Sequence, residues 1–338
     1  MSIADALAKA LTKEGVKSDK VKDIGLYLST GIPNVDYALS GKYRGGGFKS
    51  ARIHEIAGPP SAGKTQLATA VMIGAQQAGG ASDFQDHERS FDEKIAREFG
   101  LDTTPGIYTY KRPRSFEESL NQAIDWMETI RGAKVIPFEA PLVVVFDSFA
   151  AMVPEAKLER KNGLNMKDKL SLATAASQEL PGFNALVEEN NALVLFLNQL
   201  RTKPGVMFGD PRYTVGGEAL PYYASTRMYL GRSVNKDKKT KEFLGQSITA
   251  ETIKNKTYRP FVKTSWEFKF REDGSGYIDP VESMIDHLIE IEGIERDGTK
   301  IVWEGQSYDR TKILAAVEKT PNALDVLITM AEKKQGVV

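Results

Sequence analysis

The chain has 338 residues, of which 41% are apolar and 27% charged, a composition typical of a folded protein with a sizeable buried core. Its formal net charge is zero, which excludes attraction of nucleic acid by the molecule as a whole, so any such binding must come from a local patch. The lack of cysteine excludes disulfides and thiol chemistry, and three scattered histidines do not indicate a zinc site. No apolar run reaches the roughly 18 residues of a membrane span, so we expect no membrane partner and a cytoplasmic location.

The first segment has a short amphipathic pattern. Apolar residues recur at helical spacing between residues 3 and 13, which predicts a helix, and a lysine-containing linker follows as far as Lys22. A helix on such a tether docks either on its own domain or on a neighbouring subunit, and the sequence leaves both open. Residues 26–29 then look extended, residues 32–39 look helical, and glycines mark a turn at 41–47.

The stretch Gly58–Thr65 reads GPPSAGKT and lies between an apolar run, Ile53 to Ala57, and a run of helix formers, Gln66 to Gln77. Strand, glycine-rich turn and helix in this order are the context of a phosphate-binding loop, in which backbone N–H groups surround an anion at a helix N-terminus. Lys64 would reach the outer phosphates and the Thr65 hydroxyl would bind Mg²⁺. The alternative is a chance match, which the flanking strand and helix argue against.

The segments that follow alternate between strand and helix patterns. Solid apolar runs at Leu142–Phe146 and Leu193–Leu197 are typical of buried parallel strands, and Ile107–Tyr110 is a shorter strand. Residues 83–92 are too polar for a buried strand throughout, although Phe84 and Gln85 are suited to end one. Helix patterns cover 95–99, 115–131 and 170–189, the last with Pro181 inside it, which should kink or split that helix. The alternation predicts a doubly wound α/β sheet with its site at the carboxyl edge.

Polar residues at the strand ends are the candidates for chemistry. Asp147 closes an apolar strand, where it either holds Mg²⁺ or is a helix cap or a solvated strand end. Glu88 lies in an acidic segment and is either the group that activates water or a solvated glutamate. Gln199 closes the next strand and is placed to sense a terminal phosphate and pass its state to the segment after it.

Residues 201–223 have no regular period and contain several glycines and prolines. A loop of this length in a compact domain is usually functional. Its basic groups suit phosphates and its apolar and aromatic groups suit bases, as in single-stranded nucleic acid binding. A lid over the nucleotide or a disordered loop is the alternative. The residues concerned are Arg201, Lys203, Met207, Phe208, Arg212 and Tyr213.

The last third of the chain returns to strands and then forms a small unit. Strand patterns occupy 224–231, 247–254 and 262–270, and the basic segment 232–241 between the first two reads as a hairpin tip. Residues 280–338 predict a helix near 280–291, a short β segment near 300–303, and helices near 309–317 and 321–334.

Several motifs together resemble the RecA-type recombinases. The run from Gln199 to Arg227 is similar to their second DNA-binding loop and the helix after it. Asp86-His87-Glu88 resembles their glutamate-bearing segment, Asp147-Ser148-Phe149-Ala150-Ala151 their Walker B run, and Lys254-Asn255-Lys256 their late KNK segment. The motifs follow the family's order from about residue 28 to 270. The short N-terminus and the Ile-Asp-Pro that opens the last region are more like the phage, UvsX-like branch.

The resemblance implies a RecA-like P-loop ATPase core at residues 28–275, with an oligomerisation helix and linker at 1–27 and a small C-terminal α/β domain at 276–338. It implies ATP and Mg²⁺ as cofactors, and single- and double-stranded DNA and further copies of the chain, in a helical filament, as partners. The implied function is homologous pairing and strand exchange by a DNA-dependent ATPase in the cytoplasm of a bacterial host.

The resemblance also assigns roles to individual positions. Glu88 is implied to activate water, Gln199 to sense the γ-phosphate, and Lys64 to act with them in catalysis. Thr65 and Asp147 would hold the metal. Nucleotide contacts are expected from Gly58, Pro59, Pro60, Ser61, Ala62, Gly63, Lys64, Thr65, Gln66, Asp92 and Asp147, and from Lys254 and Lys256 of the adjacent subunit. DNA contacts are expected from Arg201, Lys203, Met207, Phe208, Arg212, Tyr213, Gly216 and Gly217, and from Lys167 and Lys169 in the first DNA loop.

The sequence departs from the family in a few places. Ile95 stands where a tyrosine often stacks on adenine, Pro60 where a glutamate is common, and the first DNA loop near Glu159–Lys169 matches poorly. Two other readings stay open. One is a RecA-core ATPase of another class, a ring helicase or a KaiC-like regulator, and the other is a mediator that binds ATP only as a structural clamp.

Overall fold

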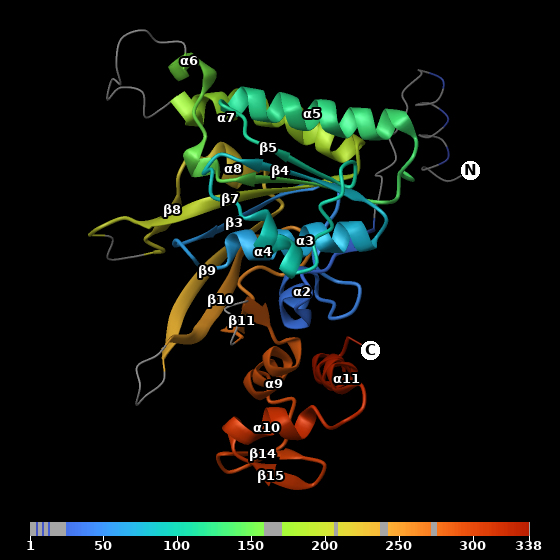
Figure 1. Cartoon of the computed structure of the whole chain (residues 1–338), viewed down its shortest axis with the longest axis vertical. Coiled ribbons are helices and arrows are strands. Elements are labelled where there is room, and N and C mark those ends of the chain that lie inside the picture. Colours follow the sequence, from blue (N-terminus) through green and yellow to red (C-terminus); the bar gives the residue numbers. More distant parts are fainter. Residues whose placement is uncertain are drawn as a thin grey trace.

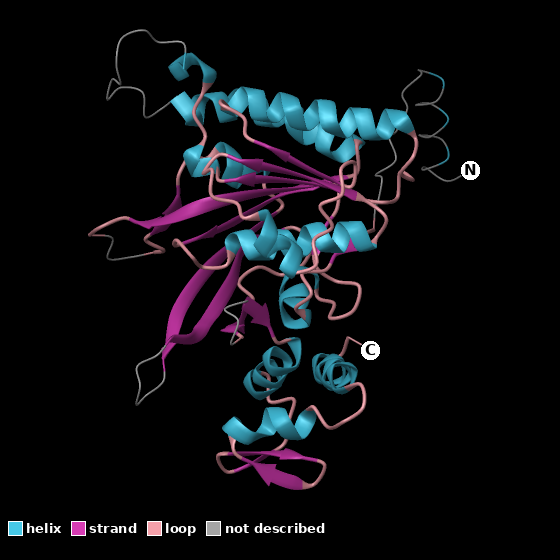
Figure 2. Ribbon diagram, in the orientation of Figure 1, coloured by secondary structure: helices cyan, strands magenta, loops and turns pink. Residues whose placement is uncertain are grey.

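A large, mostly parallel sheet is the centre of the fold in the computed structural model (Figures 1 and 2). The structure describes residues 25–158, 171–205, 209–236, 243–271 and 276–337, together with Asp5, Lys9 and Lys13. These three residues are helical, as predicted for 3–13, and the rest of that segment and the linker after it lie outside the described residues. No helix in the described part of the chain is long and apolar enough to cross a membrane.

The strands run parallel across the sheet in the order β5–β4–β6–β7–β3–β9, and β10, β11 and β12 extend it antiparallel. This confirms the predicted α/β class, with the sheet's carboxyl edge formed by the ends of β3, β4, β6 and β7. The strand bounds are β3 Arg52–Gly58, β4 Ala81–Asp86, β5 Tyr108–Lys111, β6 Leu142–Asp147, β7 Ala192–Thr202, β8 Arg212–Thr214, β9 Thr226–Lys236, β10 Phe243–Asn255, β11 Lys263–Phe270 and β12 Gly276–Ile278.

Helices cover both faces of the sheet. Helices α3 (Lys64–Gln77) and α4 (Glu93–Glu98) lie on one face, and α5 (Phe116–Ala133), α7 (Ser171–Glu189) and α8 (Ala219–Tyr223) on the other (Figure 1). Each face has its own buried apolar cluster, because successive residues of a strand point to opposite sides. A 3₁₀ turn η1 (Phe149–Ala151) and the short α6 (Glu155–Leu158) follow β6.

A smaller unit follows the sheet and packs against α2 (Pro33–Ser40). This helix connects the paired strands β1 (Tyr27–Leu28) and β2 (Phe48–Lys49). The smaller unit consists of α9 (Pro280–Glu290), α10 (Arg310–Val317), α11 (Ala323–Gln335) and the sheet β13 (Arg296–Asp297), β14 (Lys300–Trp303) and β15 (Gln306–Tyr308). Its apolar core also takes in Tyr37 and Tyr43 from the first part of the chain. The hydroxyl of Tyr43 lies 2.7 Å from Nε2 of His287, and ion pairs join Arg44 to Asp325 and Glu332.

Strand β4 agrees with the prediction that residues 83–92 do not form a buried strand throughout, because the strand ends at Asp86, one residue after Gln85. Every residue of Ala81–Asp86 is buried. The polar side chains are tolerated because they are paired: Asp83 forms an ion pair with Lys111 at 3.1 Å, and Gln85 donates to Asp83 and accepts from Ser119. Phe84 and Gln85 therefore lie inside the strand, and Asp86 ends it.

Helix α7 was expected to kink or split at Pro181, but it runs without a break from Ser171 to Glu189. A proline inside a helix removes one backbone hydrogen bond. Here Leu180, Phe183 and Val187 are buried in the same apolar cluster on both sides of the proline, which holds the two halves in one helix.

Residues 201–223 are also more regular than predicted. Strand β7 continues to Thr202, and β8 returns antiparallel to it, with Leu200 opposite Thr214 and Thr202 opposite Arg212. The expected irregular loop is thus a hairpin followed by α8, which begins at Ala219, two residues after the glycine pair expected to open it. The predicted hairpin tip 232–241 is shorter, because β9 extends to Lys236 and β10 begins at Phe243.

Candidate nucleotide site and adjoining hairpin

The glycine-rich turn joins β3 directly to α3, as predicted. Gly63 precedes the helix with φ +81°, and a Cβ at this position would lie 2.8 Å from Cδ1 of Ile248, so both conformation and space require glycine. No side chain caps the N-terminus of this 14-residue helix. Its first N–H groups and the helix dipole are therefore available to an anion.

Lys64 is folded back over the turn. Its Nζ donates to the carbonyl of Pro59 at 3.0 Å and to that of Gly58 at 3.2 Å. Burial lowers the pKa of the Lys64 ammonium, while the charges of Asp147 and Glu88 oppose this change. A partly desolvated ammonium held beside a helix N-terminus is suited to the outer phosphates of a nucleotide.

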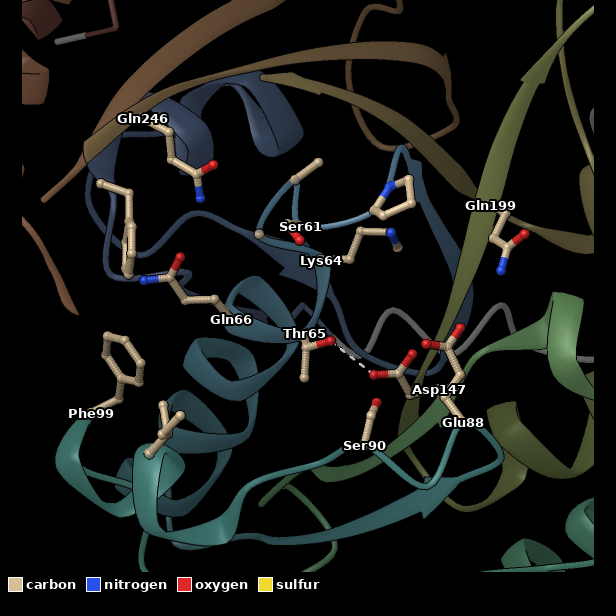
Figure 3. Close-up of a pocket in the computed structure, with 15 residues that line it drawn as sticks. Ser61, Lys64, Thr65, Gln66, Glu88, Ser90, Phe99, Asp147, Gln199 and Gln246 are labelled. Carbon is tan, nitrogen blue, oxygen red and sulfur yellow. Dashed lines mark hydrogen bonds between the residues drawn. The ribbon is translucent and has the colours of Figure 1, made fainter. Parts of the chain in front are cut away.

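Thr65 and Asp147 meet as expected for a shared metal. The Thr65 hydroxyl donates to Oδ2 of Asp147 at 2.8 Å (Figure 3). Burial raises the pKa of Asp147 to about 6, and the hydrogen bond from Thr65 opposes the shift. A buried carboxylate and a hydroxyl are oxygen ligands that Mg²⁺ accepts, with water and phosphates completing its shell. The described residues contain no cluster of three or more histidine, cysteine or acidic side chains that could hold a metal ion.

Glu88 lies at the carboxyl end of β4, beside Asp147 in the same pocket (Figure 3). Its Oε1 accepts a hydrogen bond from Ser148 Oγ at 2.5 Å, and its backbone N–H donates to the carbonyl of Asp147. The turn that carries it is organised by Asp86, whose buried carboxylate accepts from the N–H groups of Arg89 and Phe91 and from the Tyr110 hydroxyl. This role of Asp86 was not predicted, although its position at the end of β4 was the available signal.

These groups line one pocket of about 490 Å³. In Figure 3, Lys64, Asp147, Glu88 and Gln199 lie toward one end of it, and Gln66, Phe99 and Gln246 toward the other. The pocket thus has a charged end for phosphates and an amide and aromatic end, to which Ile95 also belongs, for a base. Four further residues of this lining were not predicted from the sequence: Ser90, Phe99, Gln246 and Phe268.

Gln66 lines the main pocket, and Asp92 does not. Asp92 lines a smaller adjoining pocket of about 230 Å³ together with Gln66, Ile95 and Phe99. One carboxylate oxygen of Asp92 caps α4 by accepting from the N–H groups of Lys94 and Ile95. The buried Nε2 of Gln66 has no hydrogen-bond partner among the described residues, so it is open to a ligand.

Lys254 and Lys256 are not part of this pocket within one chain. Ile248 of β10 lies beside Gly63 of the glycine-rich turn, and the two lysines come six and eight residues after it. This separation corresponds to about 20–26 Å along an extended chain. Nζ of Lys254 donates to the carbonyls of Pro221 and Tyr222 at the end of α8, at 2.7 Å each. Burial lowers the pKa of Lys254 to about 8. Their predicted role in the site of an adjacent subunit stays a prediction.

The β7–β8 hairpin carries the described residues of the predicted DNA loop. Arg201 and Lys203 are exposed, and the Lys203 ammonium lies 5.3 Å from the centre of the Tyr213 ring. Arg212 is already engaged, because Asp210 and Glu251 both bind its guanidinium, and these hydrogen bonds hold its pKa above its usual range. Met207, Phe208, Lys167 and Lys169 lie outside the described residues. The glycine pair 216–217 packs closely on Phe149 and Ala173.

Comparison with known proteins matches this arrangement. A family model described as the RecA N-terminal domain matches residues 7–275. The chain is 33% identical to Protein RecA of Chloroherpeton thalassium over 297 residues, which cover 86% of this chain and 77% of that protein. It is 34% identical to Protein RecA of Rhodospirillum rubrum over 92% of this chain and 78% of that one, and 31% identical to that of Sinorhizobium medicae over 97% and 85%. Among solved structures, that of the RadB recombinase superposes with a TM-score of 0.48 at 20% identity, covering 73% of this chain and 97% of that one.

Proposed function

This chain belongs to the RecA family, and from that premise we infer how its residues perform the family's reaction. It is a recombinase and a DNA-dependent ATPase that binds ATP. The observation that carries the assignment is the match over residues 7–275, because this range contains both the nucleotide pocket and the β7–β8 hairpin.

The ATP phosphates bind at the N-terminus of α3, where Lys64 leaves the carbonyls of Gly58 and Pro59 to contact the outer phosphates. Thr65 and Asp147 hold Mg²⁺, which when bound neutralises charge on the phosphate oxygens. Glu88 accepts the proton of the attacking water, and the hydrogen bond from Ser148 fixes the orientation of its carboxylate. Gln199 lies at the same end of the pocket as these groups and contacts the γ-phosphate.

Lys254 and Lys256 complete the pocket of an adjacent subunit. Supporting this, they lie outside their own chain's pocket, and Lys256 is exposed. A head-to-tail contact of this kind repeats from subunit to subunit, and it gives an open helical filament where the rotation between subunits does not close a ring. The segment 1–27 would add to the contact between neighbouring copies, outside the core at 28–275, while residues 276–338 form a separate domain that captures duplex DNA.

Single-stranded DNA binds along the hairpin. Exposed cations beside an aromatic ring suit a strand whose bases stack and whose phosphates face Arg201 and Lys203. The described residues of this surface also include Tyr213, Arg212, Gly216 and Gly217. Met207, Phe208, Lys167 and Lys169, which lie outside the described residues, are proposed to contact the DNA as well. Double-stranded DNA is then tested for homology against the bound strand.

A phage origin within the UvsX-like branch accounts for the Ile278-Asp279-Pro280 segment at the start of the last domain, and the protein would then act in the cytoplasm of an infected bacterium. The genes that flank this one test the origin. A surrounding set of bacterial housekeeping genes would contradict it.

The function is tested by mixing the protein with single-stranded DNA, Mg²⁺ and a non-hydrolysable ATP analogue and imaging the product. We expect helical filaments with the wild type and none with Lys64→Ala. Strand exchange is then measured with homologous and heterologous duplexes, of which only the first should react. Absence of filaments together with ring-shaped particles would favour a helicase instead.

A further inference from the structure

Three polar residues from three neighbouring strands form a buried network, which we name the Glu55–Asn198–Arg227 network. Glu55 of β3 accepts from Arg227 Nε of β9 at 2.5 Å and from Asn198 Nδ2 of β7 at 2.8 Å. Glu55 and Asn198 are completely buried, and the Arg227 side chain is 14% exposed. Replacing a buried ion pair by apolar residues is often neutral or stabilising, so fold stability alone does not account for charges at this place.

The network reaches the root of the hairpin through two hydrogen bonds. The Arg227 guanidinium donates to Oγ1 of Thr214 at 3.0 Å, and Asn198 Nδ2 donates to the carbonyl of Val215 at 3.0 Å. Thr214 is the last residue of β8, and the glycine pair that leads to α8 follows Val215. The returning strand of the hairpin is therefore attached to the network at its base.

The network also borders the nucleotide site. Asn198 precedes Gln199, and its Oδ1 accepts from the Gln199 N–H at 2.9 Å. In the parallel ladder Ala57 lies opposite Asn198 and Gly58 opposite Gln199, so the network adjoins the beginning of the phosphate-binding turn. Because side chains alternate along a strand, Gln199 faces the nucleotide pocket while Asn198 faces the side of the sheet that carries α7 and α8.

We propose that Glu55, Asn198 and Arg227 act as positioning residues that make the DNA affinity of the hairpin depend on the bound nucleotide. A displacement of Gln199 by a γ-phosphate moves Asn198, and the hydrogen bonds of Asn198 and Arg227 transmit it to Val215 and Thr214. The coupling is strong because a buried charge that loses a partner is costly, so the three side chains move together rather than separately. The inference rests on the proposed function, since it requires that Gln199 contacts ATP and that the hairpin contacts DNA.

The test uses two variants and a matched control. Asn198→Leu removes the central hydrogen bonds, and Thr214→Val removes only the hydroxyl that Arg227 contacts. Asn34→Leu is the control, because Asn34 is also buried and its Nδ2 also donates two hydrogen bonds, to Thr264 and Ser265, which do not belong to the network. Affinity for a fluorescent oligothymidine is measured with and without a non-hydrolysable ATP analogue, and thermal unfolding and affinity for the analogue are measured beside it.

In the wild type and in Asn34→Leu the analogue should tighten DNA binding by about 5- to 150-fold, the usual range of coupling between two sites. In Asn198→Leu and Thr214→Val this ratio should fall towards one, while affinity for the analogue is unchanged. A ratio equal to the wild type, or DNA binding weakened equally with and without the analogue, overturns the inference and leaves the recombinase function standing. If Asn198→Leu fails to fold, Thr214→Val decides by the same criteria. A wild type whose DNA binding ignores the nucleotide would refute the proposed function as well.

Discussion

The replacement of Glu88 by glutamine tests the chemistry of the pocket most directly. The amide keeps the shape of the side chain and an oxygen that still accepts the hydrogen bond from Ser148, but it takes up no proton. Loss of a general base lowers turnover by about 10²- to 10⁴-fold, which corresponds to roughly 3–5 kcal/mol of transition-state free energy. We therefore expect ATP hydrolysis on saturating single-stranded DNA to fall by at least two orders of magnitude.

Binding of ATP should behave differently from turnover. Burial is the largest cause of the raised pKa of Asp147, and among the neighbouring charges the Glu88 carboxylate has the largest effect. A negative charge in this pocket also repels a triphosphate. Removing it leaves ATP affinity unchanged or tighter, and filaments should form and persist. The assay is single-turnover hydrolysis combined with competition against a fluorescent nucleotide.

The matched control for this variant is Glu93→Gln. Glu93 lies five residues after Glu88, as the first residue of α4, and forms an exposed ion pair with Arg97, so its substitution should leave turnover unaltered. If Glu88→Gln hydrolyses ATP at the rate of Glu93→Gln, the base is another group and the assignment of Glu88 fails. Equal loss of ATP binding and turnover would instead identify Glu88 as a binding residue.

Three further predictions concern other parts of the chain. Gly216→Ala places a Cβ 2.1 Å from Cε1 of Phe149 at φ +101°, and should lower the free energy of unfolding, measured in urea, by about 1–3 kcal/mol. The control Gly209→Ala has φ +82° but no neighbouring atom within 4 Å, so it should lower this free energy by less. Equal losses in the two variants would contradict the packing argument. Burial lowers the pKa of His287 to about 4, below its ordinary 6.5, so the imidazole binds a proton less well in the folded than in the unfolded state. The contribution of neutral His287 to folding stability is therefore complete above pH 6.5 and is lost as the pH falls through 4. At 1.36 kcal/mol per pKa unit, this contribution is about 3 kcal/mol. Chemical unfolding measured between pH 7.5 and 4 should show a smaller loss of stability with falling pH for His287→Gln than for the wild type, and parallel curves would refute this prediction. Lys256→Ala, at an exposed position, should change thermal stability by less than about 0.5 kcal/mol yet reduce ATP-dependent filament assembly, and normal assembly would argue against a site shared between subunits.

Local sequence signals predicted the strands and helices around the nucleotide well. The apolar runs of β6 and β7 mark buried parallel strands, and a glycine-rich turn before a helix is recognisable within a dozen residues. The end of β4 was predicted to within one residue, but the sequence did not show that its polar side chains are paired with Lys111 and Ser119, which lie on β5 and α5. The hairpin was missed because its short return strand is specified by pairing with β7 and not by its own pattern.

The lining of the pocket shows the same limit. Lys64 and Thr65 were found because they belong to the glycine-rich motif, and Asp147 and Gln199 because they follow apolar runs. Glu88 was found because it lies in an acidic segment between the motif and Asp147. Phe268 and Gln246 were not, since they come from β11 and β10, far along the chain, and reach the pocket only through the antiparallel extension of the sheet. No local pattern distinguishes these two side chains from other residues of their strands.

The structure also suggests why a sheet serves to join nucleotide chemistry to DNA. A strand exposes alternate residues to its two faces, so a displacement at one face reaches the other within a single residue. Gln199 and Asn198 occupy such neighbouring positions, with the phosphates on one side and the attachment of β8 on the other. The adjacent strand β3 carries Glu55 and leads into the phosphate-binding turn, so it also connects the two faces. Exchange of Asn198 should therefore separate DNA binding from the nucleotide without altering the pocket, whereas exchange of Gln199 should affect both.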